Sequence, residues 1–239
     1  MQLTLDHVIL RAADPAAALA ELAEKLAAPV LVPVTEAGPF TSGLVRAGAL
    51  DIEVLALGSA PPPRVQGYGL GFLADTSLAE ASAALRELGF ATSVPTGATA
   101  NGRAWAAVQV HGLLPDPFPL PTSTRPPGLI DRLTESAAGV LGKIPAVAKT
   151  ASRNAGQSMV VVTEYRFDQE AWRASAGDGP DVYSVEVGTG GHDWSRLPVE
   201  PGPLLLHTGG SVGVRRITFE GDAESFALGD VEFEFSSAA

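Results

Sequence analysis

The stretch Leu5-Asp6-His7-Val8-Ile9-Leu10 predicts a β-strand at the start of the chain. Asp14-Pro15 follows, and an Ala/Leu-rich segment comes next. Asp14 is a natural helix N-cap, and proline suits the first helical position, so this segment is predicted to be a helix. Three further β-like runs, 30–34, 44–47 and 51–55, are broken by glycine and proline. The predicted order is therefore strand, helix, strand, strand, strand.

A second series with the same order and spacing follows. Residues 68–74 form an apolar strand, and Ser77 with Glu80 fits the capping box of a helix that runs to about residue 88. Residues 91–94 and 103–111 predict two strands separated by a Thr/Gly/Asn turn, and residues 159–167 have the composition of the fourth strand. This internal repeat predicts an α+β fold of repeated βαβββ units.

The first unit also resembles a known family. The Asp-His-Val-Ile-Leu strand, the helix opened by Asp-Pro-x-x-Ala and the Gly-x-x-Asp-Ile-Glu-Val hairpin of residues 48–54 resemble the vicinal oxygen chelate superfamily, and within it the glyoxalase-like branch. The resemblance implies a cupped mixed sheet with outer helices around a small-molecule site. In that superfamily a histidine on a unit's first strand and a glutamate on its last strand commonly hold a divalent metal. His7 and Glu53 match those positions.

Three units are expected along the chain. The first βαβββ unit spans residues 1–58, and the second spans 65–167 with an insert at 112–158. A degenerate, β-rich third unit spans 178–239 and is expected to extend or cap the sheet. The insert begins with a proline-rich run and continues with helical periodicity over 130–144, which fits either a surface helix or a lid over a pocket. Residues 168–173 predict a short helix or turn.

The candidate catalytic centre depends on which side chains face the cup. Alternation puts Val8 on the helix side of the first strand and His7 on the cup side. One histidine and one glutamate are too few for a catalytic metal site, and residues 68–72 contain no second histidine. Glu164 is the candidate third ligand, which would give His7, Glu53 and Glu164 around Zn, Fe, Mn, Ni or Co. In a metal-free version, Glu53 or Glu164 would act as general base.

A second group of polar side chains shares one face of the strand at 103–111. If that face lines the cup, Trp105 offers a stacking surface, while Gln109 and His111 orient a substrate. Arg103 lies on the same face and is awkward to bury under a helix. The predicted substrate-binding residues are therefore Arg103, Trp105, Gln109 and His111.

Composition limits the classes of function. The 239 residues carry a formal net charge of −11, which argues against a nucleic-acid backbone or an anionic membrane as the main partner. Cysteine is absent, so thiolate chemistry and disulfides are excluded. No signal peptide is recognisable, and no apolar run reaches ~18 residues. We expect a cytoplasmic protein that binds a small molecule. A homodimer is possible.

Two hypotheses of function follow. The first is a glyoxalase-like small-molecule enzyme of the isomerase, lyase or dioxygenase type, with or without a divalent metal. The alternative is a non-catalytic protein of the same fold that binds a small molecule, for example by sequestering an antibiotic. The pair of His7 and Glu53 favours an enzyme, whereas the missing histidine at 68–72 favours the metal-free version or the binding protein.

Overall fold

The computed structural model describes residues 1–37, 40–57, 61–100, 102–114, 122–123 and 158–237. Three helices and fifteen strands lie in this part of the chain. The helices are α1 (Pro15–Leu26), α2 (Leu78–Glu87) and α5 (Gln169–Ala174). The strands are β1 (Leu3–Arg11), β2 (Val30–Ala37), β3 (Phe40–Ala47), β4 (Leu50–Leu57), β5 (Gln66–Ala74), β6 (Ala91–Ser93), β7 (Thr96–Ala100), β8 (Arg103–His111), β9 (Thr122–Ser123), β10 (Met159–Tyr165), β11 (Val182–Gly188), β12 (Leu204–His207), β13 (Gly213–Glu220), β14 (Phe226–Leu228) and β15 (Val231–Ser236).

The first unit consists of β1, α1 and the antiparallel strands β2, β3 and β4. Asp14 caps α1 as predicted, because its carboxylate accepts hydrogen bonds from the backbone amides of Ala16 and Ala17. β1 then pairs in parallel with β4, and His7 lies opposite Asp51 in this register. The strand order β2-β3-β4-β1 is that of a βαβββ unit.

The second unit repeats this arrangement with one difference from the prediction. Ser77 and Glu80 form the predicted capping box of α2, and β5 pairs in parallel with β10, which pairs antiparallel with β8. Residues 96–100, predicted to be part of a turn, form strand β7. Threonine favours extended backbone, and β8 offers β7 a partner along residues 103–107. The turn itself is tighter, and Gly102 with φ of +75° lies in it.

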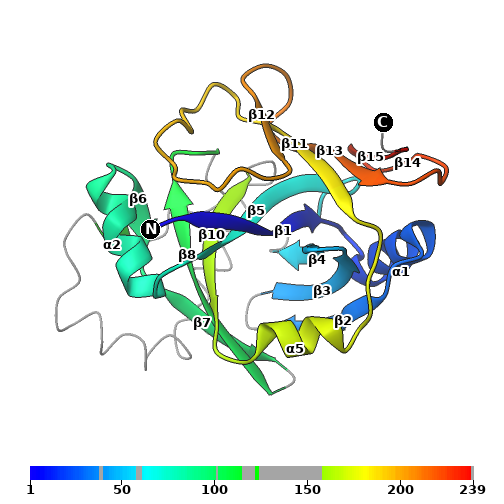
Figure 1. Ribbon diagram of the computed structural model, residues 1–239, viewed down its shortest axis with the longest axis horizontal. Helices are drawn as coiled ribbons and strands as arrows, with labels where there is room; N and C mark the ends of the chain where they lie inside the picture. The colour runs from blue at the N-terminus through cyan, green and yellow to red at the C-terminus, as the bar shows by residue number, and fades with distance from the viewer. Residues whose placement is uncertain (38–39, 58–60, 101, 115–121, 124–157, 238–239) are drawn as a thin grey trace.

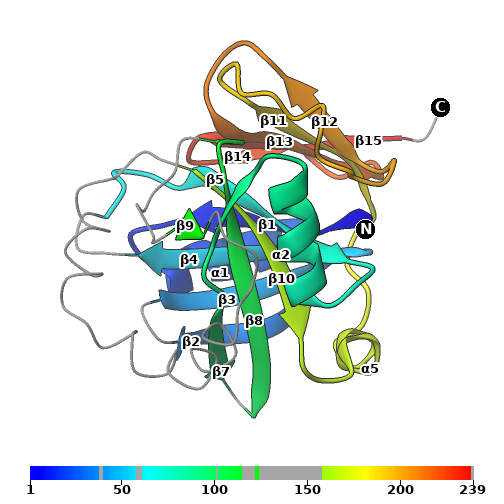
Figure 2. The same cartoon turned by 90° about the vertical axis from the view of Figure 1, so that its left-hand side faces the viewer.

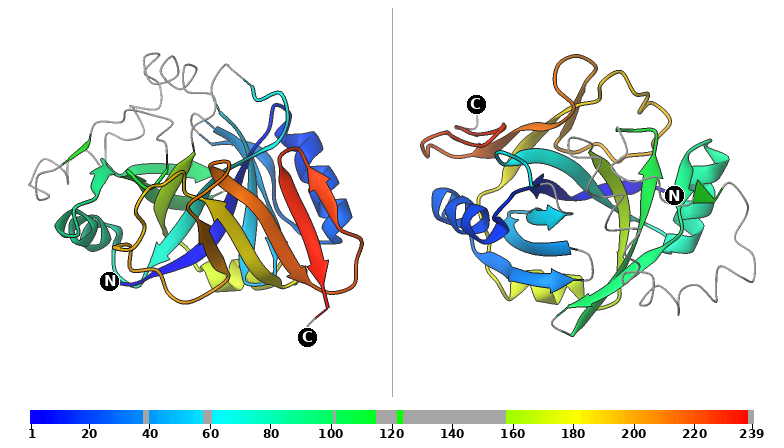
Figure 3. Two further views of the ribbon diagram at one scale, coloured as in Figure 1. Left: turned by 90° about the horizontal axis from the view of Figure 1, so that it is seen from above. Right: turned by 180° about the vertical axis from the view of Figure 1, so that it is seen from behind.

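The two units join through β1 and β5, which pair antiparallel. The result is a ten-stranded, curled mixed sheet, with β2 near one end and β8 near the other. Figure 1 and the right panel of Figure 3 show the sheet curling on itself, and β7 comes into contact with β2. The predicted α+β class with a cupped mixed sheet is confirmed.

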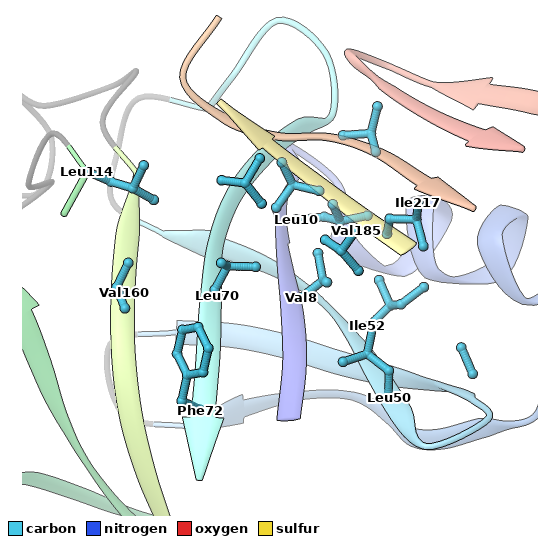
Figure 4. Packing of buried hydrophobic residues seen from close by; sticks show 14 of the residues in the cluster. Val8, Leu10, Leu50, Ile52, Leu70, Phe72, Leu114, Val160, Val185 and Ile217 are labelled. Carbon is cyan, nitrogen blue, oxygen red and sulfur yellow. The ribbon is translucent and has the colours of Figure 1, made fainter. Parts of the chain in front are cut away.

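The C-terminal segment forms a second sheet of five strands in the order β12-β11-β13-β15-β14. Figure 2 shows it as a layer on one side of the curled sheet. Val185 and Ile217 of this layer pack against Val8, Leu10 and Leu70, as Figure 4 shows. All five side chains are fully buried, and each such side chain contributes about 1.5–3 kcal/mol by leaving water. The third unit therefore caps the outer face of the main sheet.

The insert at 112–158 lies largely outside the described residues, and so do its predicted helix and lid. Within the described part, β9 pairs with β6, and the indole of Trp194 donates a hydrogen bond to the Leu113 carbonyl at 2.8 Å. Among the described residues, no helix has the length and apolar character needed to cross a membrane.

Candidate functional site

The two faces of β1 have different surroundings. Val8 and Leu10 belong to the large core that also contains side chains of α1 and of the C-terminal sheet. Ile9 belongs to a second, smaller cluster on the opposite face, as predicted from alternation. This cluster lines the concave face of the sheet and consists of Ile9, Leu55, Leu57, Tyr68 and Met159, with Val161 packed against it.

His7 is buried on this concave face, between two carboxylates. Its Nδ1 atom lies 2.8 Å from Oδ2 of Asp6, and its Nε2 atom lies 3.9 Å from Oε2 of Glu53. Two consecutive residues of a regular strand point to opposite faces. Here the register between β1 and β5 shifts between Leu5 and His7, and such an irregularity re-aims side chains. This shift lets Asp6 reach the ring of its neighbour.

Gly71 of β5 makes room for the imidazole. It lies directly opposite His7 in the antiparallel register of β1 and β5. A Cβ atom at position 71 would overlap with three atoms of the His7 ring, Cε1, Nε2 and Nδ1. The imidazole therefore occupies the space into which any side chain at position 71 would project.

The carboxylate of Asp6 accepts four hydrogen bonds. Oδ2 is hydrogen-bonded to the His7 ring and accepts from the hydroxyl of Tyr165 at 2.7 Å. Oδ1 accepts from Gln169 Nε2 at 3.0 Å and from Arg173 NH2 at 2.6 Å. Tyr165 ends β10, whereas Gln169 and Arg173 belong to α5. The side chain of Asp6 is completely buried, so these donors replace the water that it loses.

Arg173 also connects Asp6 to Asp51 at the start of β4. Its Nε donates to Asp51 Oδ2 at 2.9 Å, and Arg46 donates to the other oxygen of Asp51 at 3.0 Å. The four charges are two aspartates and two arginines, so the network is neutral in total. Each charge of such a buried network needs its partner, because an uncompensated charge there costs several kcal/mol.

The surroundings shift the pKa values of this group in opposite directions. Burial alone would raise the pKa of Asp6, but His7, Arg173 and Tyr165 outweigh it and hold that pKa well below its usual range. Burial alone would lower the pKa of His7, but Asp6, Glu53 and Asp51 together raise it above the usual 6.5. The protonated form of the His7 ring is therefore stabilised relative to that of a free histidine.

Glu164 lies elsewhere. Its Oε1 accepts a hydrogen bond from the backbone amide of Leu78, the first residue of α2, and its other oxygen lies 3.6 Å from Arg166. Two residues earlier, Val162 belongs to the large outer core, so Glu164 faces the helix side of the sheet. The structure brings His7 and Glu53 together but does not bring Glu164 to them.

The described residues do not fit the expected metal centre. No group of three or more His, Asp or Glu side chains in this part of the chain is arranged to hold a metal ion. A catalytic site of this kind usually has three protein ligands, whereas the potential ligand that approaches His7 Nε2 among the described contacts is Glu53. The Asp6 carboxylate is engaged by four donors, and position 71 has no side chain. We therefore derive no catalytic step through a metal.

The four predicted substrate-binding residues lie on β8. Gln109 lies opposite Val161 of the concave face, so its alternation partners Trp105 and His111 share that face. Gln109 and His111 are buried, and Trp105 is half-buried. The Arg103 guanidinium lies over the ring of Trp172, 5.4 Å from its centroid, and thus contacts α5. Their role in binding stays a prediction.

Sequence reasoning assigned no role to several residues of this site. They are Asp6, Asp51, Tyr165, Gln169 and Arg173. An aspartate directly before the candidate histidine was a usable signal, because a carboxylate inside an apolar strand needs partners. The α5 residues gave no such signal.

Comparisons with known proteins place this architecture. Over 99% of the chain it is similar to a hypothetical protein from Staphylococcus aureus, with all of that chain covered, 7% identity and a TM-score of 0.62. A variant of 4-hydroxymandelate synthase from Streptomyces coelicolor matches 92% of this chain and 71% of its own, with 13% identity and a TM-score of 0.53. That synthase has the vicinal oxygen chelate fold.

This protein has the vicinal oxygen chelate fold. The search of solved structures also finds methylmalonyl-CoA epimerase from Mycobacterium tuberculosis, at 13% identity, with 70% of this chain and 90% of that chain covered and a TM-score of 0.38. No protein-family model and no curated protein matches the sequence. The predicted resemblance to this superfamily is confirmed at the level of the fold.

Proposed function

We propose that the protein is a small-molecule enzyme in which His7 and Glu53 act as an acid and base pair on the concave face of the sheet. The observation that carries this proposal is the 3.9 Å separation between His7 Nε2 and Glu53 Oε2. The distance is longer than a hydrogen bond, so the two groups do not bond to each other. A substrate can contact both, with an oxygen at His7 and a hydrogen at Glu53. Asp6 fixes the ring from the other side.

The proposed reaction is the transfer of a proton next to a carbonyl group. Glu53 takes a proton from the carbon beside the carbonyl, and the C–H electron pair forms the new carbon–carbon double bond of an enediol or enol. The His7 imidazolium gives its Nε2 proton to the carbonyl oxygen. Glu53 then gives its proton to the former carbonyl carbon of the enediol, while neutral His7 takes the proton of the other hydroxyl, which becomes the new carbonyl and completes an isomerisation. The apolar cluster of Ile9, Leu55 and Met159 would exclude water and strengthen these interactions.

This assignment follows from the surroundings of His7 and from the exposure of Glu53. The surroundings raise the pKa of His7 and so favour its protonated form, which suits the role of proton donor. The Glu53 side chain is 20% exposed, whereas the side chains of Asp6 and Asp51 are completely buried among donors. Glu53 is therefore the carboxylate of this cluster that a substrate can reach.

Solvent exchange on a panel of candidate substrates tests the proposal. A set of 2-hydroxy and 2-oxo carbonyl compounds is incubated with the enzyme in D2O, and the loss of carbon-bound hydrogen is followed by NMR. The wild type should exchange at least one compound, and Glu53→Gln should lower the rate at least about 100-fold. Glu232→Gln is the matched control, because Glu232 is a strand carboxylate at the exposed surface. Equal rates in wild type and Glu53→Gln, or no exchange by the wild type, would refute the proposal.

A further inference from the structure

Asp6 divides its hydrogen bonds between two parts of the molecule. One carboxylate oxygen binds His7 of β1 and Tyr165 of β10, and the other binds Gln169 and Arg173 of α5. The contact between Arg173 and Asp6 joins residues 167 positions apart. The catalytic histidine of the proposed function is thus one carboxylate away from a helix that follows the second unit.

We propose that Asp6 is a positioning residue that, held by α5, keeps His7 in one orientation with its proton on Nδ1 and its Nε2 atom directed at Glu53. This inference rests on the proposed function for its catalytic meaning. The ionised carboxylate of Asp6, to which Tyr165, Gln169 and Arg173 already donate, is an acceptor only, so the ring nitrogen beside it must donate. The Nε2 atom then becomes the nitrogen that exchanges a proton with substrate.

Helix α5 prevents the carboxylate from turning away. It has six residues, none of them buried, and it is attached by the polar contacts of Gln169 and Arg173 and by the ring of Trp172, which packs against Tyr165 and Phe167. Arg173 holds Asp6 and Asp51 together, and its side chain is only 14% exposed. Figure 1 shows α5 below strand β3. Rotation of the Asp6 carboxylate would break the contacts to Gln169 and Arg173, and these contacts therefore fix the partner of His7.

The tautomer of His7 can be measured in the full-length protein without any substrate. Long-range proton–nitrogen NMR on 15N-labelled protein distinguishes the two neutral forms, at a pH high enough to neutralise the ring. The chain has four histidines, and His7→Gln assigns the signal. We expect His7 as the Nδ1–H form with a slowly exchanging proton. A ring in the Nε2–H form, or an equal mixture, would overturn the inference.

Asp6→Asn provides the decisive variant. Arg173 can only donate to position 6, so the introduced amide should keep its oxygen toward Arg173 and turn its NH2 group toward His7. The ring should then switch to the Nε2–H form. The Asp-to-Asn variant of the serine protease triad likewise holds its histidine in the wrong tautomer. Solvent exchange of the substrate should fall at least about 100-fold. An unchanged tautomer in this variant would contradict a positioning role.

Tyr165→Phe is the matched control. It removes one donor from the same carboxylate oxygen and leaves the charge of Asp6 in place. His7 should keep its proton on Nδ1, and a switch in this variant would contradict the inference. If Asp6→Asn does not fold, the wild type and Tyr165→Phe still decide the question. Because the tautomer is read without substrate, its failure is distinguishable from a failure of the proposed proton transfer.

Discussion

The strands β1 and β5 occupy the same place in their respective units, yet they contribute opposite things to the concave face. β1 carries Asp6 and His7, whereas β5 has glycine at positions 67, 69 and 71. The two strands lie side by side, and His7 faces Gly71. One unit supplies functional groups, and the other supplies the space that they need.

This difference explains why the second unit has no counterpart of His7. The imidazole lies where a Cβ atom at position 71 would lie, so a second large side chain there is incompatible with the observed ring position. The other two glycines make room for backbone. A Cβ at Gly69 would overlap with the Met159 carbonyl, and one at Gly67 would overlap with the Val214 carbonyl of β13. The glycines of β5 thus allow close approach on both faces of the sheet.

The largest loss of stability is expected when the cation that neutralises Asp6 and Asp51 is removed. Arg173→Met should lower the free energy of unfolding by about 3–5 kcal/mol, because Asp6 and Asp51 would stay buried without their shared cation. Arg216→Met removes an arginine that pairs with three glutamates on the more exposed C-terminal sheet, and it should cost about 0–1 kcal/mol. Urea unfolding of both variants measures the difference, and equal losses would contradict a buried network.

The next effect concerns space for backbone. Gly67→Ala should destabilise the protein by about 3 kcal/mol, because the added methyl group meets main-chain atoms of Val214 that have no flexible end to move. Gly209→Ala is the control, since a Cβ there meets nothing within 4 Å, and it should change stability by less than about 0.5 kcal/mol. Thermal unfolding compares the two. A tolerated alanine at position 67 would show that the two sheets are less closely packed than described.

A smaller loss of stability, which a second substitution should remove, is expected at the glycine that faces His7. Gly71→Ala should cost about 2 kcal/mol, because the methyl group and the imidazole cannot share one space. In the His7→Ala background the same change should cost almost nothing, since the competing ring is gone. A double-mutant cycle on the free energy of unfolding gives the coupling between the two positions. An equal cost of Gly71→Ala in both backgrounds would contradict the claim that the His7 ring occupies the space of a side chain at position 71.

The smallest effect concerns the carboxylate of the second unit. Glu164→Gln should lower stability by about 0.5–1 kcal/mol, because a charged acceptor at the N-terminus of α2 becomes neutral. Hydrogen exchange of the first-turn amides of α2 should become faster, while the amides of β4 keep their protection. If β4 responds instead of α2, Glu164 has a connection to the concave face that its contacts do not reveal.

Much of the fold was predictable because its signals are local. Asp14 and the capping box of Ser77 and Glu80 specify two helix starts through neighbouring backbone amides, and both are confirmed. Strand β7 was missed because its threonines and glycine also suit a turn, and its state depends on pairing with β8. The predicted unit boundaries stay predictions, and most of the insert lies outside the described residues.

The candidate site was predictable only in part. Alternation and the family resemblance placed His7 and Glu53 on one face, and the 3.9 Å contact between them agrees with this. The convergence with Glu164 was wrong because alternation on β10 puts that side chain on the face of Val162. The contact between Asp6 and Arg173 spans 167 positions, and no spacing rule within one element reports such a pair.

The most direct test of the central claim is a kinetic cycle on His7 and Glu53. Solvent hydrogen exchange into the substrate is measured for the wild type, His7→Gln, Glu53→Gln and the double variant. Groups that act as one unit give strongly non-additive losses. The account predicts that each single variant loses at least about 100-fold and that the double variant loses hardly more than the worse single variant. Losses that multiply in the double variant, or a single variant that retains full activity, would contradict it.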